Sequence, residues 1–172
     1  MLRKIILGAA LSLAILVVVA GVSRADSSGQ SVVGSYTRVD VSPSTFHGRF
    51  DVLAHREDDD EGRGEGEESE VSGRVRFIDF DGSVGNFTGK VTCLNVVGNM
   101  AAVGFRIKKS SEPTYPVGSG LVMHLFDGGA PVGGQGVDGF SADAPLLEAP
   151  TTCPTPRLDH FTPGIGNYVI TN

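Results

Sequence analysis

Two aspartates near the middle of the chain, Asp79 and Asp81, have a spacing that could serve carboxylate chemistry. They lie two residues apart in the sequence DFDGS, at the predicted end of a strand. Side chains two positions apart on a strand point to the same face, so the pair could act as the acid and base of a glycosidase or hold a metal ion. Because Asp-Gly is also a common turn sequence, we interpret the segment as a turn.

A small secreted hydrolase, acting on polysaccharide, is the catalytic alternative that these residues allow. The sequence contains no HExxH motif, no GxSxG nucleophile elbow and no phosphate-binding loop. The active site of such a hydrolase would therefore depend on Asp79, Asp81 and His124. A Ser-His-Asp site could also be assembled from distant positions. No set of reactive residues converges in the sequence, so we predict a protein without catalytic residues.

A strongly acidic run could bind calcium, which prefers oxygen ligands. The run from Glu57 to Glu70 contains nine acidic residues, with Asp58, Asp59 and Asp60 in a row. It fails the EF-hand pattern, because a glycine and an arginine stand where an acid and a glycine are required. We interpret the run as a solvated loop, since it cannot bury apolar area.

Asp138 lies in a second calcium-like segment, GGQGVDGFS, which matches the nonapeptide of calcium-binding β-rolls. A β-roll binds calcium between stacked copies of this repeat, and the chain contains one copy. We therefore interpret the segment as a glycine-rich loop before a short strand. We predict no cofactor beyond loosely bound calcium, for which the candidate ligands are Asp58, Asp59, Asp60, Asp79, Asp81 and Asp138.

The N-terminal residues place these groups in an exported protein. Arg3 and Lys4 precede a long apolar run, and Ser23 and Ala25 fit the small residues that precede a cleavage point. We predict a signal peptide that forms a helix over residues 1–25, a flexible lead-in over 26–35, and a single domain over 36–172 that contains an acidic loop at 56–70. An uncleaved apolar run would be a membrane anchor, and this is the only membrane association that we expect. The expected location is secreted or in the cell envelope.

The charge of the mature chain limits its expected partners. Removing residues 1–25 takes away three of the 14 basic residues and none of the 20 acidic ones, which leaves a formal charge of −9. Such a chain should repel nucleic acid and anionic lipid surfaces. The partner is unknown, and the charge favours cations or a basic protein surface.

The two cysteines, Cys93 and Cys153, are predicted to form a disulfide, because exported proteins fold in an oxidising compartment. They are 60 residues apart. Closing a loop of that length stabilises a fold by about 4 kcal/mol in the chain-entropy model. No further cysteine or histidine stands at metal-ligand spacing beside either one.

The elements that carry all these residues are predicted to be strands. Apolar and polar residues alternate over 46–55, 70–80 and 120–129, and shorter strands are expected near 135–143 and 167–171. No segment of ten residues has helical periodicity. With 24 glycines and repeated turn signals, we predict an all-β, antiparallel domain, either a sandwich or barrel-like.

The segment of residues 88–107 is predicted to form a hairpin with Gly98-Asn99 at its tip. This turn pairs Val97 with Met100 and Cys93 with Gly104, so that a disulfide could cross over the glycine. One face of the hairpin is apolar and is expected to lie in the core. The opposite face, expected to be partly covered, carries Val91, Cys93, Val97 and Met100.

An ordered series of motifs resembles a known family. GKVTCLNVVGNMAAVGFRI at residues 89–107 is followed by DGGAP at 127–131, VDGFSAD at 137–143, the second cysteine and a final YVIT. The series, over residues 46–171, is similar to small exported bacterial all-β domains of unknown function with a GxVTCLxVxGNxA hairpin and a DGGxP loop. The resemblance implies an exported bacterial β-domain and brings no catalytic residues.

The function that we predict is therefore that of an exported non-catalytic β-domain, an envelope or extracellular interaction module whose ligand is unknown. The alternatives are the small secreted hydrolase and a weak calcium-binding module.

Overall fold

A computed structural model describes residues 29–38, 48–57, 70–80, 85–129, 138–157, 162–163 and 165–172. The predicted signal peptide and its helix, most of the acidic loop, and Asp58, Asp59, Asp60 and Asp81 lie outside these residues. None of the described residues belongs to a helix of the length and apolarity needed to cross a membrane.

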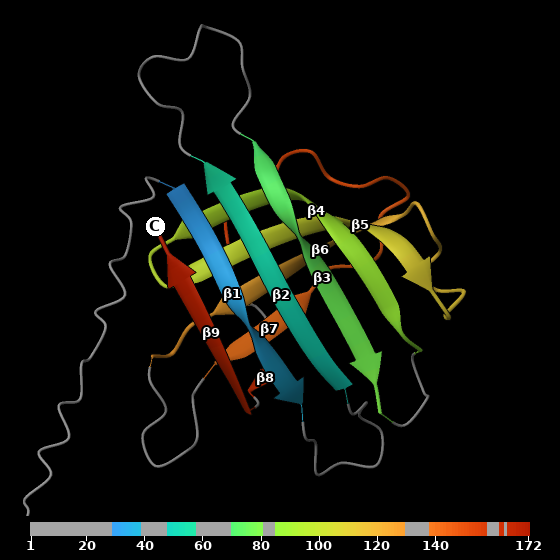
Figure 1. Cartoon of the computed structure of the whole chain (residues 1–172), viewed down its shortest axis with the longest axis horizontal. Coiled ribbons are helices and arrows are strands. Elements are labelled where there is room, and N and C mark those ends of the chain that lie inside the picture. Colours follow the sequence, from blue (N-terminus) through green and yellow to red (C-terminus); the bar gives the residue numbers. More distant parts are fainter. Residues whose placement is uncertain are drawn as a thin grey trace, which may run out of the picture.

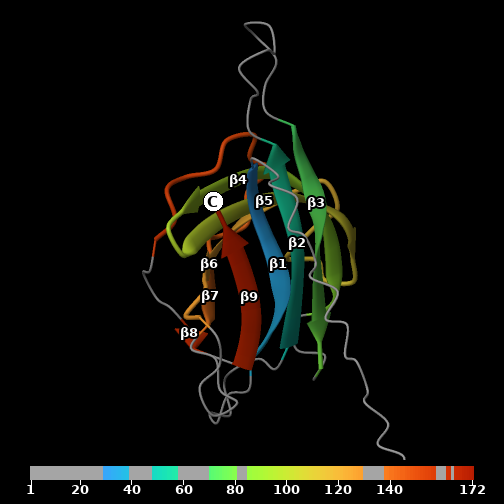
Figure 2. The same cartoon turned by 60° about the vertical axis from the view of Figure 1, so that its left-hand side comes forward.

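The described residues form one antiparallel sheet with the strand order β8-β7-β6-β5-β4-β3-β2-β1-β9. The all-β prediction is thus confirmed. Figure 1 shows β9, β1, β2 and β3 in front of the later strands, which cross behind them, and the turned view in Figure 2 shows the same two layers from the side. The strand bounds are β1 Gly29–Arg38, β2 Gly48–Glu57, β3 Val71–Asp79, β4 Phe87–Val97, β5 Met100–Ser110, β6 Gly120–Phe126, β7 Gly139–Ala142, β8 Thr162–Pro163 and β9 Ile165–Thr171.

Strand β4 carries the sheet from one layer to the other, which makes the sheet barrel-like. Its first residues, Phe87 to Lys90, pair with β3, whereas pairing with β5 continues to Val97. Past Lys90, side chains of the first layer take the place of β3. Gln30 bonds the backbone N–H and C=O of Val96 at 3.0 and 3.4 Å, and Arg56 donates to the C=O of Leu94 at 2.9 Å.

Two aspartates close the gap between the last strand in the chain and the opposite layer. The backbone N–H of Tyr168 donates to Asp138 at 2.6 Å, and that of Ile170 donates to Asp127 at 3.2 Å. The other oxygen of Asp138 accepts from the N–H of Gly128 at 3.0 Å. On the edge of β9 that no described strand pairs with, carboxylates therefore bind backbone N–H groups.

The interior of the barrel is filled by aromatic side chains. Phe50 lies between Phe77 and Phe140, with ring centroids 4.5 and 4.8 Å away, and Tyr36 stacks on Tyr168 at 6.1 Å. All five side chains belong to a single buried core cluster. These ring contacts pack the described part of the barrel interior with side chains.

The predicted hairpin is confirmed, with one correction. Val97 pairs with Met100 and Cys93 with Gly104, and Gly98 has a φ of +61°, which both primed hairpin turns require at this position. However, Val91 is 1% exposed and lies in the core, on the face opposite to the one predicted. A β-bulge between Val91 and Cys93 adds Thr92 to one strand and reverses the faces of the residues before it.

The predicted flexible lead-in over residues 26–35 is also corrected, because residues 29–35 belong to β1. This strand pairs with β2 on one side and β9 on the other. Val32 and Tyr36 are fully buried on its inner face. The many small and polar residues of this segment obscured the alternation of buried and exposed positions in the sequence. Pairing with β2 and β9 determines its conformation.

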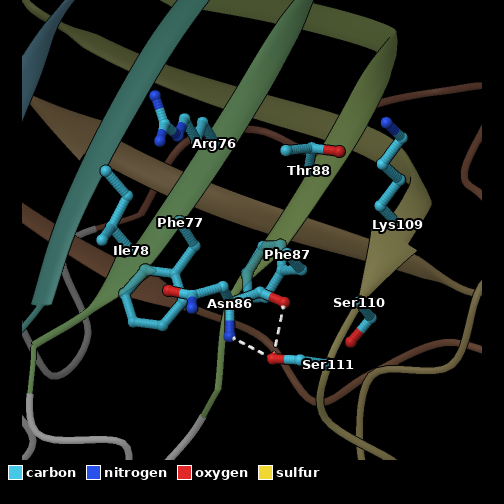
Figure 3. Close-up of a pocket in the computed structure, with 9 residues that line it drawn as sticks. All are labelled: Arg76, Phe77, Ile78, Asn86, Phe87, Thr88, Lys109, Ser110 and Ser111. Atoms are coloured by element: carbon cyan, nitrogen blue, oxygen red, sulfur yellow. Dashed lines mark hydrogen bonds between the residues drawn. The ribbon is translucent and has the colours of Figure 1, made fainter.

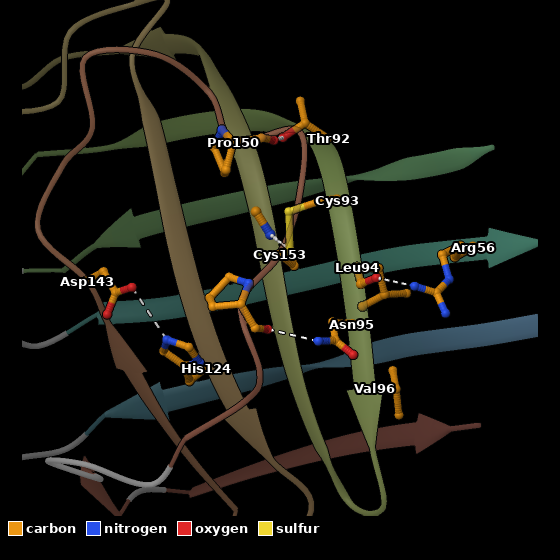
Figure 4. Close-up of a disulfide and its surroundings, with 12 residues drawn as sticks. Arg56, Thr92, Cys93, Leu94, Asn95, Val96, His124, Asp143, Pro150 and Cys153 are labelled. Atoms are coloured by element: carbon orange, nitrogen blue, oxygen red, sulfur yellow. Dashed lines mark hydrogen bonds and ion pairs between the residues drawn. A yellow bond between two sulfur atoms is a disulfide. The ribbon is translucent and has the colours of Figure 1, made fainter. Parts of the chain in front are cut away.

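The predicted disulfide between Cys93 and Cys153 is present, and Figure 4 shows it on the outer side of β4 and β5. It holds the segment of residues 143–157, here called the strap, against the strands. Thr92 donates to the C=O of Pro150 at 2.6 Å, and Asn95 to that of Pro154 at 3.0 Å. The side chains of Cys93 and Cys153 pack with Ala102 and Val122 in a second, smaller core cluster.

Candidate binding surface on the outer face of β1 to β5

Asp79, one of the predicted acid groups, is used in the connection between β3 and β4. Its carboxylate accepts a hydrogen bond from the N–H of Gly85 at 2.7 Å, and its own N–H donates to the side-chain oxygen of Asn86 at 2.8 Å. Both contacts fix the path of the chain. They agree with our interpretation of this segment as a turn, although Asp81 and Gly82 lie outside the described residues.

His124, the third residue of the hydrolase hypothesis, lies far from Asp79. It pairs with Ala102 in the register of β5 and β6, level with Asn95 near the end of β4, whereas Asp79 contacts Asn86 directly before β4 begins. The structure therefore does not bring the predicted acid and histidine together.

The surroundings of His124 contain the residue types of a hydrolytic triad but not its geometry. Ser141 is the neighbour of His124 on β7. The Nε2 atom of His124 lies 3.5 Å from the carboxylate of Asp143, and Figure 4 marks this contact with a dashed line. That distance is too long for a hydrogen bond, and neither ring nitrogen has one among the described residues. The side chain is 1% exposed, and Arg157 binds Asp143. No substrate can reach this imidazole.

Asp138, the candidate from the β-roll-like segment, is 1% exposed, and both of its oxygens accept backbone hydrogen bonds. Its role in the structure is to close the barrel. Within the described ranges, no three metal-ligating side chains gather. Calcium binding by the acidic run stays a prediction.

A different set of residues gathers on the outer face of the first layer, in a row that crosses six strands. Neighbouring strands bring Val169, Val33 and Leu53 side by side, and the row continues through Arg74, Lys90 and Arg106. Half of the row is thus aliphatic and half is cationic. A parallel row contains Asn167, Ser35, Asp51, Arg76, Thr88 and Lys109.

The cations of these two rows are here called the basic face. All are exposed, and none lies within ion-pair distance of an acid in the part of the chain that the structure describes. Asp51 is the one acid in these two rows, and it binds Arg49 at 2.6 Å. Like charges on neighbouring strands destabilise a sheet, and an anion bound across these strands would offset that repulsion. The basic face consists of Arg74, Arg76, Lys90, Arg106 and Lys109.

Two hollows adjoin the basic face. The smaller, of about 400 Å³, is shown in Figure 3, where Arg76, Thr88 and Lys109 lie along one side and Ser110 and Ser111 lie near the strand ends. The larger, of about 700 Å³, is lined by residues of β1, β2, β3 and β4, which include aliphatic and cationic side chains and the carboxylate of Asp51. Arg76 and Thr88 line both hollows, so the two lie next to each other.

This surface was missed from the sequence because it depends on two irregularities in the pairing of β4 with β5. One is the bulge at Thr92, and the other is a register shift between Thr88 and Gly89 that leaves out Lys108 and brings Lys109 beside Thr88. In a regular hairpin, Lys90 would point inward and Val91 outward. With the extra residue, Lys90 turns outward between Arg74 and Arg106. The alternation of Arg74 and Arg76 with apolar residues was visible, but their alignment with cations of other strands was not.

No protein family model, curated protein or solved structure matches this chain. The resemblance to small exported bacterial β-domains stays a prediction.

Proposed function

We propose that this protein is an exported, non-catalytic binding module that uses the basic face and the adjoining hollows to bind an anionic ligand. The observation that carries the proposal is the group of five exposed cations without an acidic partner among the described residues. The net charge of the sequence favoured cations or a basic protein surface as the partner, and an anionic ligand on the sheet face replaces that expectation.

The net negative charge of the chain does not oppose this function. Exposed charges are screened beyond about 8 Å at physiological salt. A ligand on the outer face therefore responds to the cations beneath it more than to the formal charge of −6 of the whole chain. Asp51 is the only acid in the two rows, and Arg49 partly neutralises it.

The burial of His124 and the turn role of Asp79 support a binding function over a hydrolytic one. A hydrolase needs a nucleophile or an activated water within reach of an acid and a base. His124 is closed off from solvent, and the carboxylates of Asp79 and Asp138 bind backbone N–H groups.

Binding of sulfated dextran, with neutral dextran as the reference, tests the proposal. We expect the purified chain to bind the sulfated polymer with an affinity that falls steeply with salt. The double variant Arg74→Gln/Lys90→Gln should bind about tenfold more weakly, because exposed ion pairs contribute up to about 1 kcal/mol each.

The matched control is Val97→Glu/Thr155→Glu, which lowers the net charge by the same amount on exposed positions. Val97 lies seven residues, about 23 Å, from Lys90 along β4, and Thr155 follows Pro154, whose C=O binds Asn95 near the same end of the strand. Equal losses in the two double variants would show a net-charge effect and contradict a localised site.

A further inference from the structure

We propose that the anionic ligand of this surface is a single amphiphile, an aliphatic chain with a carboxylate or phosphate head, lying across the strands. This inference rests on the proposed function and adds the ligand class. The head group contacts Arg74 and Arg76, and the chain lies over the aliphatic half of the row.

The aliphatic half of the row consists of side chains that a soluble protein has little reason to align. Val169, Val33 and Leu53 are 44%, 48% and 43% exposed, and they are direct neighbours on β9, β1 and β2. Leu53 is in turn the neighbour of Arg74. From Val169 to Arg74 the row spans three strand spacings, about 14 Å. An apolar strip that ends at cations matches a molecule that is apolar along its length and charged at one end.

The larger hollow lies where the two halves of the row meet. Val33 and Leu53 line it together with Arg74 and Arg76, and its volume is about 700 Å³. Asp51 also lines it, and the carboxylate of Asp51 binds Arg49 at 2.6 Å. This size falls within the range of small-molecule sites, which combine apolar walls with a few polar groups that fix orientation. Apolar walls with two guanidinium groups favour an anion that carries an apolar chain over a plain polyanion.

The strip is one residue wide, which favours one molecule over a membrane surface. On one side it is flanked by Ser31, His55 and Ser72, which are neighbours across β1, β2 and β3. On the other side lies the row that contains Asp51. An anionic bilayer pressed on this face would dehydrate these polar groups and repel the carboxylate. One chain that follows the strip leaves the flanking polar groups hydrated, and its single head group meets the carboxylate of Asp51 only beside the guanidinium groups of Arg49 and Arg76.

A series of fatty carboxylates below their micelle concentrations tests the inference by calorimetry. We expect no measurable binding of acetate, and binding of octanoate and dodecanoate that strengthens about two- to fourfold for each added methylene group. Leu53→Ser should reduce this dependence on chain length, and Arg74→Gln should weaken every member of the series. The control Val117→Ser changes a side chain that is 64% exposed on the connection before β6, and it should leave the series unchanged.

The outcomes separate this inference from the function on which it rests. If sulfated dextran binds but fatty carboxylates do not, or if Leu53→Ser has no effect, the amphiphile is wrong and the anion-binding module stands. If anionic phosphatidylglycerol vesicles bind while monomeric dodecanoate does not, the occupant is a membrane surface and the inference is overturned. If neither polymer nor carboxylate binds, the proposed function falls as well.

Discussion

The carboxylate of Asp138 accepts a hydrogen bond from the backbone N–H of Tyr168 at 2.6 Å, across 30 residues of sequence. Asp138 directly precedes β7 and Tyr168 lies within β9, so this contact joins the edge strand β9 to the strand next to the opposite edge of the sheet. The sheet thus closes through side chains where its strand ladder stops, and the stability of the barrel should depend on them.

Asp138→Asn should lower the free energy of unfolding by about 2 to 3 kcal/mol. The variant keeps one acceptor oxygen and places an amide N–H₂ against a backbone donor, so a buried charge-assisted hydrogen bond is lost. Urea unfolding followed by circular dichroism would measure the change.

Asp127→Asn is the comparison for this variant, because Asp127 makes the same kind of contact, at 3.2 Å, from a half-buried position. Its loss should be below about 1 kcal/mol. If Asp138→Asn is as stable as Asp127→Asn, or more stable, the contact between Asp138 and Tyr168 does not close the barrel.

Gly104→Ala should destabilise the protein by about 1 to 3 kcal/mol, through overpacking. A methyl group there would lie 2.6 Å from Cγ of Pro150 and would also meet the sulfur atoms of the disulfide. Thermal melting would show the loss. Gly98→Ala has open space and suffers only from its φ of +61°, so it should cost about 1 kcal/mol. A smaller loss at Gly104 than at Gly98 would contradict the close crossing of the strap.

Val91→Ala should destabilise the protein by about 2 kcal/mol, whereas Lys90→Ala should change stability by less than about 0.5 kcal/mol. The bulge places Val91 in the core and Lys90 in solvent. A regular hairpin would reverse this order, so denaturant midpoints of the two variants distinguish the two registers.

Tyr168 should make the protein lose stability in alkali. Burial raises the pKa of its hydroxyl well above the usual value near 10, and the nearby Tyr36, Asp138 and Asp51 raise it further. As pH rises past about 10, the unfolded chain ionises before the folded one. The contribution of the buried Tyr168 hydroxyl to the free energy of unfolding is therefore fully present below about pH 10. It is lost as the pH rises from there toward the raised pKa of Tyr168 in the folded state.

Tyr168→Phe should remove this part of the pH dependence. The buried hydroxyl has no hydrogen-bond partner among the described residues, so the variant should be as stable as the parent, or slightly more stable, at pH 7. Denaturant midpoints at pH 8 and pH 11 for both proteins give the test. Equal slopes with pH would place the alkaline loss on another group.

The sequence predicted those features that depend on local patterns. Gly98-Asn99 between apolar runs determined the hairpin and its register as far as Cys93. The two cysteines, in a chain predicted to be exported, were the only pair available for a disulfide within the chain. The alternation in residues 48–57 and 71–79 predicted β2 and β3, including the buried Val52 and Val75.

The features that the sequence did not reveal depend on long-range pairing. The bulge at Thr92 has no local signal, and it changed the faces of Val91 and Lys90. Strand β1 looked like a flexible lead-in because its burial comes from β2 and β9, which follow it in the chain. Asp138 looked like a calcium ligand because its real partners, Gly128 and Tyr168, lie 10 and 30 residues away.

Closure by Asp138 and Asp127 also affects how this protein meets other copies of itself. An uncovered edge strand offers its free amide groups as a template for polymerisation into fibrils. Here the amides of Tyr168 and Ile170 are already taken by carboxylates, and an approaching edge would have to displace them. The same pair of aspartates that closes the barrel should therefore also oppose pairing of the β9 edge with another copy of the chain.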